Sequence, residues 1–224
     1  MDVVFTINDG TLENVEFDDA LGLELDEDFE DIADYLHKTA VVVPDNVTHI
    51  GDRAFYDKRW LVEVVIPSST LSIGCDAFAD CNYLTVASLP DNVRTIGTRA
   101  FAWCESLTRV SIPSSVTCLE DMTYYSCSSL ESVLIADGVE VIGDNVFQYC
   151  GSLKSVVLPN SIKSIGNGAF SECKELSSVT LVNENVVISK DAFFGCSDEL
   201  TIHAKANSVV EKYAIENSFS FEPI

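Results

Sequence analysis

The strongest constraint on the fold of this chain is a cysteine that recurs every 23 residues. Six cysteines keep the spacing without a slip: Cys81, Cys104, Cys127, Cys150, Cys173 and Cys196. A fixed period of about 20 to 50 residues is typical of proteins in which each repeat packs on its neighbours. We therefore expect a repeat solenoid in which each residue lies above the one 23 positions later.

Other positions repeat in the same register and define seven coils over residues 44–204. The recurring pattern is Ile-Gly-x-x-Ala-Phe-x-x-Cys-x-x-Leu-x-x-Val-x-Ile-Pro, as in residues 96–113. The apolar columns are expected to form core ladders. The column containing Gly51, Gly74 and Gly97 is expected to hold a backbone with positive φ, which glycine adopts without steric cost.

Each coil is expected to contain one short strand and one short helical segment. The Leu-x-x-Val-x-Ile stretch has apolar positions at a period of two, which predicts a strand in a parallel sheet. The Ala-Phe-x-x-Cys-x-x-Leu stretch has helical spacing and predicts a short helix or 3₁₀ turn. The fourth coil places Glu120, Thr123 and Tyr124 in the Gly, Ala and Phe columns, so we expect it to bulge.

This repeat resembles the BspA-like leucine-rich repeat family, whose 23-residue unit carries the same core and the same terminal proline. The resemblance covers about residues 44–204. It implies a right-handed leucine-rich repeat solenoid with a binding role, often at a cell surface, and it names no ligand.

The segment before the repeats, residues 1–43, is predicted to be an acidic N-terminal cap. Residues 1–40 contain thirteen acids and one base. Val3–Ile7 is predicted to be a strand and residues 8–10 a turn. The apolar residues from Leu25 to Leu36 have helical spacing and predict an amphipathic helix. A cap is expected here because the end of a solenoid core is otherwise exposed. The alternative is a site for calcium or a basic partner at Asp26, Asp28, Glu30 and Asp31.

Residues 205–224 are predicted to form the C-terminal cap, a helix followed by a short strand. Ser208 and Glu211 match a capping box at the start of a helix. Phe219 and Phe221 alternate as in a final strand, and the resemblance implies a closing unit of this kind.

The net charge of −23 excludes nucleic acid and an anionic membrane surface as expected partners and leaves a basic partner open. No stretch is long and apolar enough for membrane insertion. No secretory signal is visible at Met1, which favours a cytoplasmic location; a cell-surface location is the alternative if a signal precedes this sequence.

Three roles are possible for the cysteine column: buried thiols, disulfides and metal ligands. Neighbouring column positions are close enough for a disulfide, but all six side chains point the same way, which favours reduced thiols in the core. A straight row with no Cys-x-x-Cys pair does not suit zinc, so we expect no metal site. Cys75 and Cys118 lie off the column and are the only two cysteines for which exposure stays open.

The sequence contains no recognisable catalytic or cofactor-binding constellation. Its three histidines belong to no nucleophile arrangement, and it lacks a Gly-x-Ser-x-Gly elbow, a phosphate-binding loop and a dinucleotide fingerprint. We expect neither an enzyme nor a bound cofactor, although a site assembled from distant residues stays open.

The outward positions of the predicted strands are the first candidate for partner binding. They form two columns, the repeat positions of residues 63 and 65, and both are almost uncharged. Their residues either serve only strand formation and solubility or form a flat binding platform. The candidate platform residues are Val65, Val86, Arg109, Leu134 and Val157.

Exposed aromatic residues are the second candidate. Trp60 and Tyr83 share one column, and Trp103, Tyr125 and Tyr149 lie in neighbouring columns near the cysteines. Such residues are either interface anchors or packing under loops.

The sequence thus predicts a non-enzymatic protein–protein interaction module with an unidentified protein partner. The alternative function is a secreted or cell-surface adhesin that binds host or matrix proteins.

Overall fold

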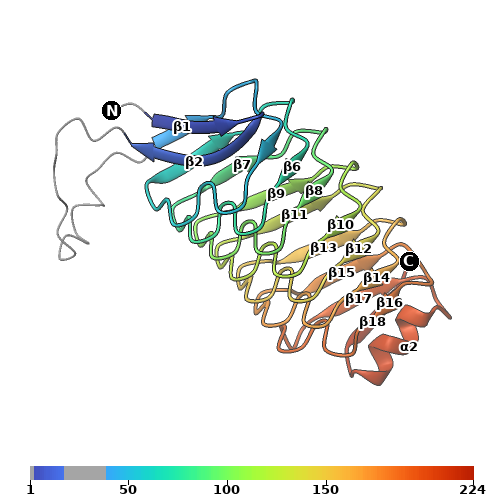
Figure 1. Ribbon diagram of the computed structural model, residues 1–224. Helices are drawn as coiled ribbons and strands as arrows, with labels where there is room; N and C mark the ends of the chain where they lie inside the picture. Colours follow the sequence, from blue (N-terminus) through green and yellow to red (C-terminus); the bar gives the residue numbers. More distant parts are fainter. Residues whose placement is uncertain (1–2, 18–38) are drawn as a thin grey trace, which may run out of the picture.

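The chain forms a parallel β-solenoid of about eight turns with very little helix. The computed structural model describes residues 3–17 and 39–224. The coils stack along one axis, from the β1–β2 hairpin at one end to helix α2 at the other (Figure 1). The predicted leucine-rich repeat architecture is confirmed.

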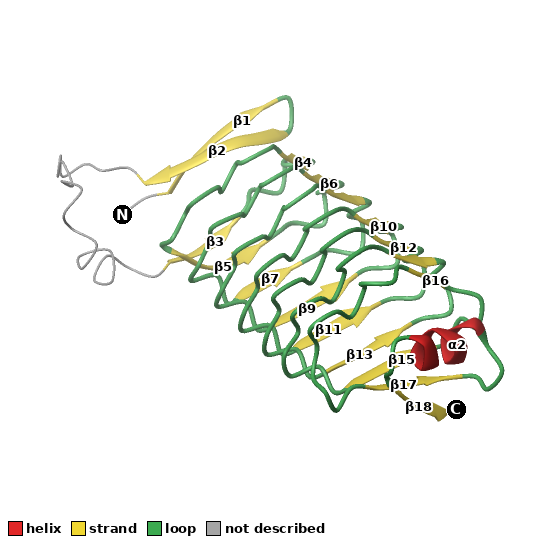
Figure 2. Ribbon diagram, turned by 90° about the horizontal axis from the view of Figure 1, so that it is seen from below, coloured by secondary structure: helices red, strands yellow, loops and turns green. Residues whose placement is uncertain are grey.

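One face of the solenoid is a sheet of three- to five-residue strands, which we call the long-strand sheet (Figure 2). Its strands alternate buried and exposed side chains, as predicted. The strands pair in parallel in two blocks. The first block contains β3 (Thr39–Val42), β5 (Leu61–Val65) and β7 (Val86–Ser88); the second contains β9 (Arg109–Ile112), β11 (Ser132–Ile135), β13 (Ser155–Leu158), β15 (Ser178–Leu181), β17 (Thr201–Ala204) and β18 (Ser220–Pro223).

A second face, the short-strand sheet, consists mainly of two-residue parallel strands and is also divided into two blocks. The first block contains β1 (Val3–Asn8), β2 (Thr11–Phe17), β4 (His49–Ile50), β6 (Ser72–Ile73) and β8 (Thr95–Ile96); the second contains β10 (Cys118–Leu119), β12 (Val141–Ile142), β14 (Ser164–Ile165) and β16 (Val187–Ile188).

Stacked aromatic rings and a row of thiols form the centre of the core. The phenylalanine column stacks with ring centroids 4.6 Å apart between Phe55 and Phe78 and 5.3 Å apart between Phe170 and Phe193. Each column thiol donates to the carbonyl oxygen of the residue 26 positions earlier, for example Cys104 Sγ to Phe78 O at 3.2 Å. All eight cysteines are free, and five of the six in the column are buried.

Of the two alternatives predicted for this part of each coil, a short helix or a 3₁₀ turn, the helix is wrong: a run of tight turns with bonds between residues three apart takes its place. In the first coil the N–H of Phe55 donates to Ala77 O in the next coil, while the N–H of Tyr56 donates to Arg53 O. Alternate amides therefore bond between coils, which leaves too few for a helix. The backbone at Arg53 and Asp57 has φ of 58° and 57°, which also interrupts a helix.

The explanation predicted for the repeating glycine column is also wrong. Positive φ occurs at Gly10, Gly138, Gly168 and Gly195, none of which belongs to that column. The column glycines instead lie against the backbone of the preceding coil: a Cβ on Gly97 would lie 2.6 Å from the N atom of Cys75. Their role is close approach between coils.

Both described ends are covered. At the N-terminal end, β1 and β2 form an antiparallel hairpin, and β2 pairs with β4 and buries Leu12 and Val15. The helix predicted around residues 25–36 and the alternative site at Asp26, Asp28, Glu30 and Asp31 lie outside the described residues. Strand β3 already pairs with β5, so the ladder begins before residue 44.

The C-terminal end has the predicted helix and strand. Helix α2 (Val209–Glu216) begins after Ser208, whose hydroxyl accepts from the N–H of Glu211 at 3.2 Å. Strand β18 pairs with β17 and completes the ladder. Across residues 3–17 and 39–224, no helix has the length and apolarity required to cross a bilayer.

Candidate functional site

The most distinctive feature of the solenoid is a break that crosses both sheets at one place. Strands β7 and β9 are not paired, and neither are β8 and β10. On either side of this break each sheet is continuous: β3 to β7 and β9 to β18 in the long-strand sheet, β2 to β8 and β10 to β16 in the short-strand sheet. We call this break the seam. It lies at the entry to the fourth coil. The bulge expected in that coil is not formed: among the described residues, the strand register shifts only between Thr6 and Ile7 and between Thr39 and Ala40.

Missing backbone hydrogen bonds define the seam. The amides of Thr108, Thr117 and Glu120 donate to no carbonyl of the preceding coil. Their equivalents one coil later form bonds of 2.8–2.9 Å: Glu131 to Thr108, Glu140 to Thr117 and Gly143 to Leu119. The turn side remains joined, since the N–H of Phe101 donates to Thr123 O at 2.8 Å. The backbone hydrogen-bond ladder is therefore interrupted at the two sheets and continues along the turns.

A groove of about 650 Å³ opens on the long-strand sheet at the seam. Residues of β7, β9 and β11 line it, among them Val86, Arg109 and Leu134. The groove reaches the inward-facing column: Ala87, Val110 and Val133 are 7–9% exposed, whereas Val179 in the same column is completely buried. Ala87 stands in a column otherwise filled by larger residues and so widens the floor.

Three of the predicted platform residues line the groove, and two lie beside it. Val86 and Leu134 are exposed on its two sides, with Arg109 between them. Val65 and Val157 are exposed on the same face but do not line the groove. The structure adds Val42, which is 67% exposed and lies in register with Val65. Val42 lies 23 residues before Val65, so the repeat spacing could have identified it. It was missed because the predicted solenoid began at residue 44.

Arg109 is the one basic side chain that lines the groove. The ion pairs among residues 3–17 and 39–224 do not include it. The lining contains no acidic side chain. An exposed guanidinium surrounded by serine hydroxyls and apolar side chains can bind a carboxylate in two-pronged geometry.

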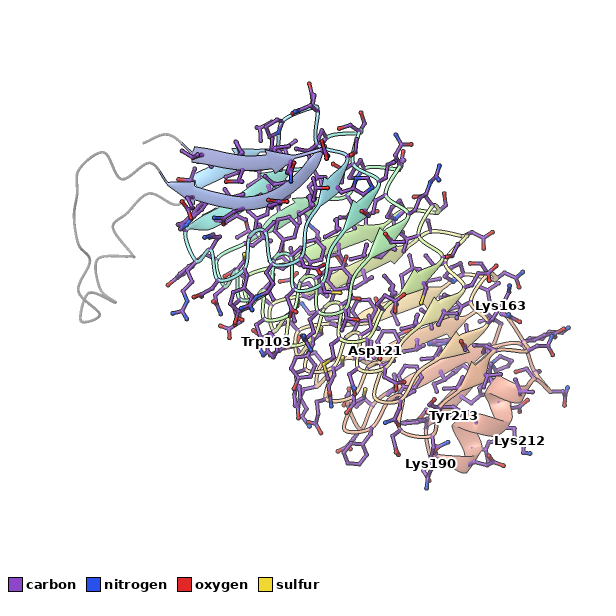
Figure 3. The ribbon with its side chains drawn as sticks, in the orientation of Figure 1. Trp103, Asp121, Lys163, Lys190, Lys212 and Tyr213 are labelled. Carbon is purple, nitrogen blue, oxygen red and sulfur yellow. The ribbon has the colours of Figure 1, made fainter. Side chains whose placement is uncertain are left out.

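The turn edge of the solenoid carries the second candidate site, an aromatic row of Trp103, Tyr125 and Tyr149. The ring centroids of Trp103 and Tyr125 are 5.4 Å apart, and those of Tyr125 and Tyr149 are 5.5 Å apart, both in edge-to-face geometry. Figure 3 shows Trp103 on the edge formed by the turns. Tyr149 is exposed, while Trp103 and Tyr125 are half-buried.

A hollow of about 340 Å³ lies next to Trp103. Its other lining residues are Arg53, Tyr56, Asp76, Asp80 and Arg99. Arg99 forms a two-pronged pair with Asp76, with N–O distances of 2.7 and 2.9 Å, and this carboxylate raises the pKa of the guanidinium. The guanidinium of Arg53 lies 4.1 Å from the ring centre of Tyr56. The charged residues of this hollow were not predicted from the sequence. All of them lie two residues before or after a core phenylalanine, and this spacing could have indicated that they share one edge of the solenoid.

The other two predicted aromatics differ in exposure. Tyr83 is exposed, whereas Trp60 is half-buried and packs against the core. Trp60 thus contributes to packing, which was one of the two roles left open for it.

Comparison with known proteins identifies the repeat. A profile described as "BspA type Leucine rich repeat region" matches in six copies over residues 29–152 and 140–222. The chain belongs to the BspA-type leucine-rich repeat family. This confirms the resemblance seen in the repeated columns, and proteins with such repeats are generally protein-interaction or surface proteins.

Solved leucine-rich repeat proteins share the fold. One from Bacteroides ovatus has a TM-score of 0.63 and 25% identity, over 83% of this chain and 54% of its own. One from Eubacterium ventriosum has a TM-score of 0.53 and 19% identity, over 92% and 64% of the two chains. The TpLRR protein of T. pallidum is 30% identical over 84% of this chain and 87% of its own, with a TM-score of 0.49.

The BspA-type chain spans about half the length of the Bacteroides ovatus protein. No curated protein matches it.

The repeat cysteines of this BspA-type solenoid are structural. Burial raises the pKa of the Cys81 thiol to about 12, which keeps it protonated and unreactive near neutral pH. Cys75 is exposed. Cys118 and the last column member, Cys196, are half-buried, and burial followed by the charge of Glu120 raises the pKa of Cys118 to about 11. Within the described ranges, no three His, Cys, Asp or Glu side chains gather as metal ligands would.

Proposed function

We propose that this protein is a non-enzymatic interaction module that binds a protein partner through the long-strand sheet, with the groove at the seam as the centre of the contact. The observation that carries the proposal is the groove itself. It coincides with three residues chosen from the repeat columns alone, Val86, Arg109 and Leu134.

The chemistry of the groove indicates the kind of segment that it accepts. Exposed apolar side chains on both sides favour a ligand that buries apolar side chains against Val86 and Leu134. Arg109 favours an acidic side chain between them, since an exposed cation without an ion pair gains a charge-assisted hydrogen bond. The partner segment is therefore apolar with one carboxylate.

A random peptide library displayed on phage tests this proposal directly. The library is selected against the full chain and against a Val86→Glu, Leu134→Glu variant, and the enriched peptides are titrated by fluorescence anisotropy. We expect peptides that contain an acidic residue, with affinity at least about tenfold weaker for the variant, as for interface hot spots.

The matched control is a Val187→Glu, Ile215→Glu variant. Both residues are exposed apolar residues, on β16 and α2, so this variant adds the same charge away from the groove. Equal loss of binding in the two variants, or enriched peptides that bind the groove variant as tightly as the unmodified chain, would contradict the proposal.

A further inference from the structure

Two residues of the aromatic row on the turn edge have a backbone conformation that does not favour aromatic residues. Trp103 and Tyr149 occupy the same position of the repeat, two residues after the core ring, with φ of 58° and 63°. This region of φ favours Gly, Asn and Asp, and Gly195 fills the equivalent position in the last coil. Large rings at strained positions are typical of functional sites.

The spacing of the row matches an extended proline-rich chain. Trp103 and Tyr149 lie two coils apart, which corresponds to about 9.6 Å along the solenoid axis at about 4.8 Å per coil. A polyproline II helix repeats every three residues with a rise of about 3.1 Å each, or about 9.3 Å per turn. A ligand parallel to the axis would present equivalent side chains to both rings.

The orientation of the rings favours this ligand over a flat sugar chain. The interplanar angle is 66° between Trp103 and Tyr125 and 80° between Tyr125 and Tyr149. Rings in edge-to-face contact at these angles form a stepped aromatic surface instead of one flat platform. Proline-rich segments in the polyproline II conformation pack their rings against such aromatic-lined surfaces.

The charge next to the row indicates a basic residue in the ligand. Asp80 precedes Trp103 by one coil in the same column and lines the hollow beside it. The two arginines of the hollow are already engaged, Arg99 with Asp76 and Arg53 with Tyr56. None of the ion pairs within residues 3–17 and 39–224 contains Asp80, and the net charge of −23 attracts cations over a longer range.

We propose that the turn edge at Trp103, Tyr125 and Tyr149 binds a proline-rich segment of a partner protein in the polyproline II conformation, with a lysine or arginine of that segment at Asp80. This surface is separate from the groove at the seam, so the two proposals stand independently.

Titration with three probes tests the ligand class. The probes are fluorescein-labelled oligoproline flanked by arginines, an arginine-flanked Gly-Ser peptide of equal length, and a cello-oligosaccharide used as a competitor. We expect the oligoproline to bind more tightly than the Gly-Ser peptide, and its anisotropy to be unaffected by the oligosaccharide. Equal binding of both peptides, or displacement by the oligosaccharide, would overturn the proposal.

Substitutions then test the site. Trp103→Asn and Tyr149→Asn remove a ring while keeping a residue suited to positive φ, and each should weaken oligoproline binding about tenfold or more. Phe194→Ser is the control, because Phe194 is an exposed aromatic residue outside the row. Unchanged affinity in both Asn variants, with unfolding curves like that of the unmodified chain, would overturn the proposal.

Two further variants test the charge and the place of the site. Asp80→Asn should weaken binding of the arginine-flanked oligoproline and leave that of an uncharged oligoproline unchanged. The Val86→Glu, Leu134→Glu variant should bind the oligoproline as the unmodified chain does. An equal effect of Asp80→Asn on both oligoprolines would overturn the assignment of Asp80, and loss of binding in the groove variant would overturn the assignment to the turn edge.

Discussion

At the scale of single residues, the recurring glycine marks where the backbones of neighbouring coils lie closest together. Gly97 has no positive φ, yet a Cβ there would lie 2.6 Å from Cys75 N and 2.7 Å from Gly74 C. Neither neighbour can move alone, because both are backbone atoms of the coil before. Glycine recurs in this column for lack of space, and the sequence pattern alone does not distinguish this cause from a turn conformation.

We predict that Gly97→Ala lowers the free energy of unfolding by about 1–3 kcal/mol, since the added methyl group must push two coils apart. The matched control is Gly151→Ala, where a Cβ would meet no atom within 4 Å. The control should change stability by less than about 0.5 kcal/mol. Urea unfolding measures both variants, and equal effects would contradict the close-approach explanation.

At the scale of the secondary-structure elements, the seam separates two blocks of strands that the turns still hold together. Three amides at the seam, those of Thr108, Thr117 and Glu120, lack the bond that their equivalents one coil later make. Regions with fewer backbone hydrogen bonds open more readily than the ladder around them. The seam is therefore the place where the solenoid is most easily deformed.

We predict that the amides of Thr108, Thr117 and Glu120 exchange with solvent deuterium faster than those of Glu131, Glu140 and Gly143, their equivalents in the next coil. The expected ratio is about fivefold, because a backbone hydrogen bond contributes roughly 1 kcal/mol. Residue-resolved hydrogen exchange by NMR checks this. Equal protection in each of the three pairs would show that the ladder is continuous in solution.

At the scale of the whole molecule, the buried thiols make stability depend on pH. Burial raises the pKa of Cys81, Cys104, Cys150, Cys173 and Cys196, to about 12 for the first and last of these. The unfolded chain, with thiol pKa values near 9.0, loses these protons first. Above that pH it binds fewer protons than the folded chain, so the free energy of unfolding falls as pH rises.

We predict that the contribution of these thiols to the free energy of unfolding is constant below pH 8. Above pH 9 the free energy of unfolding should fall by about 1.4 kcal/mol per pH unit for each such thiol. Urea midpoints measured between pH 7 and pH 11 check this. A Cys104→Ala variant should show a shallower fall, because it has one such thiol fewer. A flat midpoint up to pH 11 would contradict the prediction.

Much of the fold was predictable because each coil repeats the same residues. Phe101 and Cys104 occur in columns that are apolar in almost every coil, so their burial followed from the pattern. The capping box at Ser208 likewise marked its helix by a local hydrogen bond. The short helix predicted in each coil failed, because amides such as that of Phe55 bond to the next coil, and sequence spacing does not report that competition.

The candidate site was predictable only in part. Val86, Arg109 and Leu134 were found as outward positions of consecutive strands. The groove between them depends on a missing ladder and on the small side chain of Ala87, which are relations between coils. The hollow at Arg53 and Asp80 likewise collects residues from different coils, and the sequence does not show that they meet.

The 23-residue period by itself determined the register, the core columns and the identity of the outward positions, because stacking gives every coil the same environment at the same position. Only the tertiary structure decided where that stacking fails and which surface residues meet. Backbone hydrogen bonds and ring contacts between coils depend on small shifts of one coil relative to the next, and the sequence of a single coil does not specify those shifts. The seam, the groove and the aromatic row are consequences of those shifts.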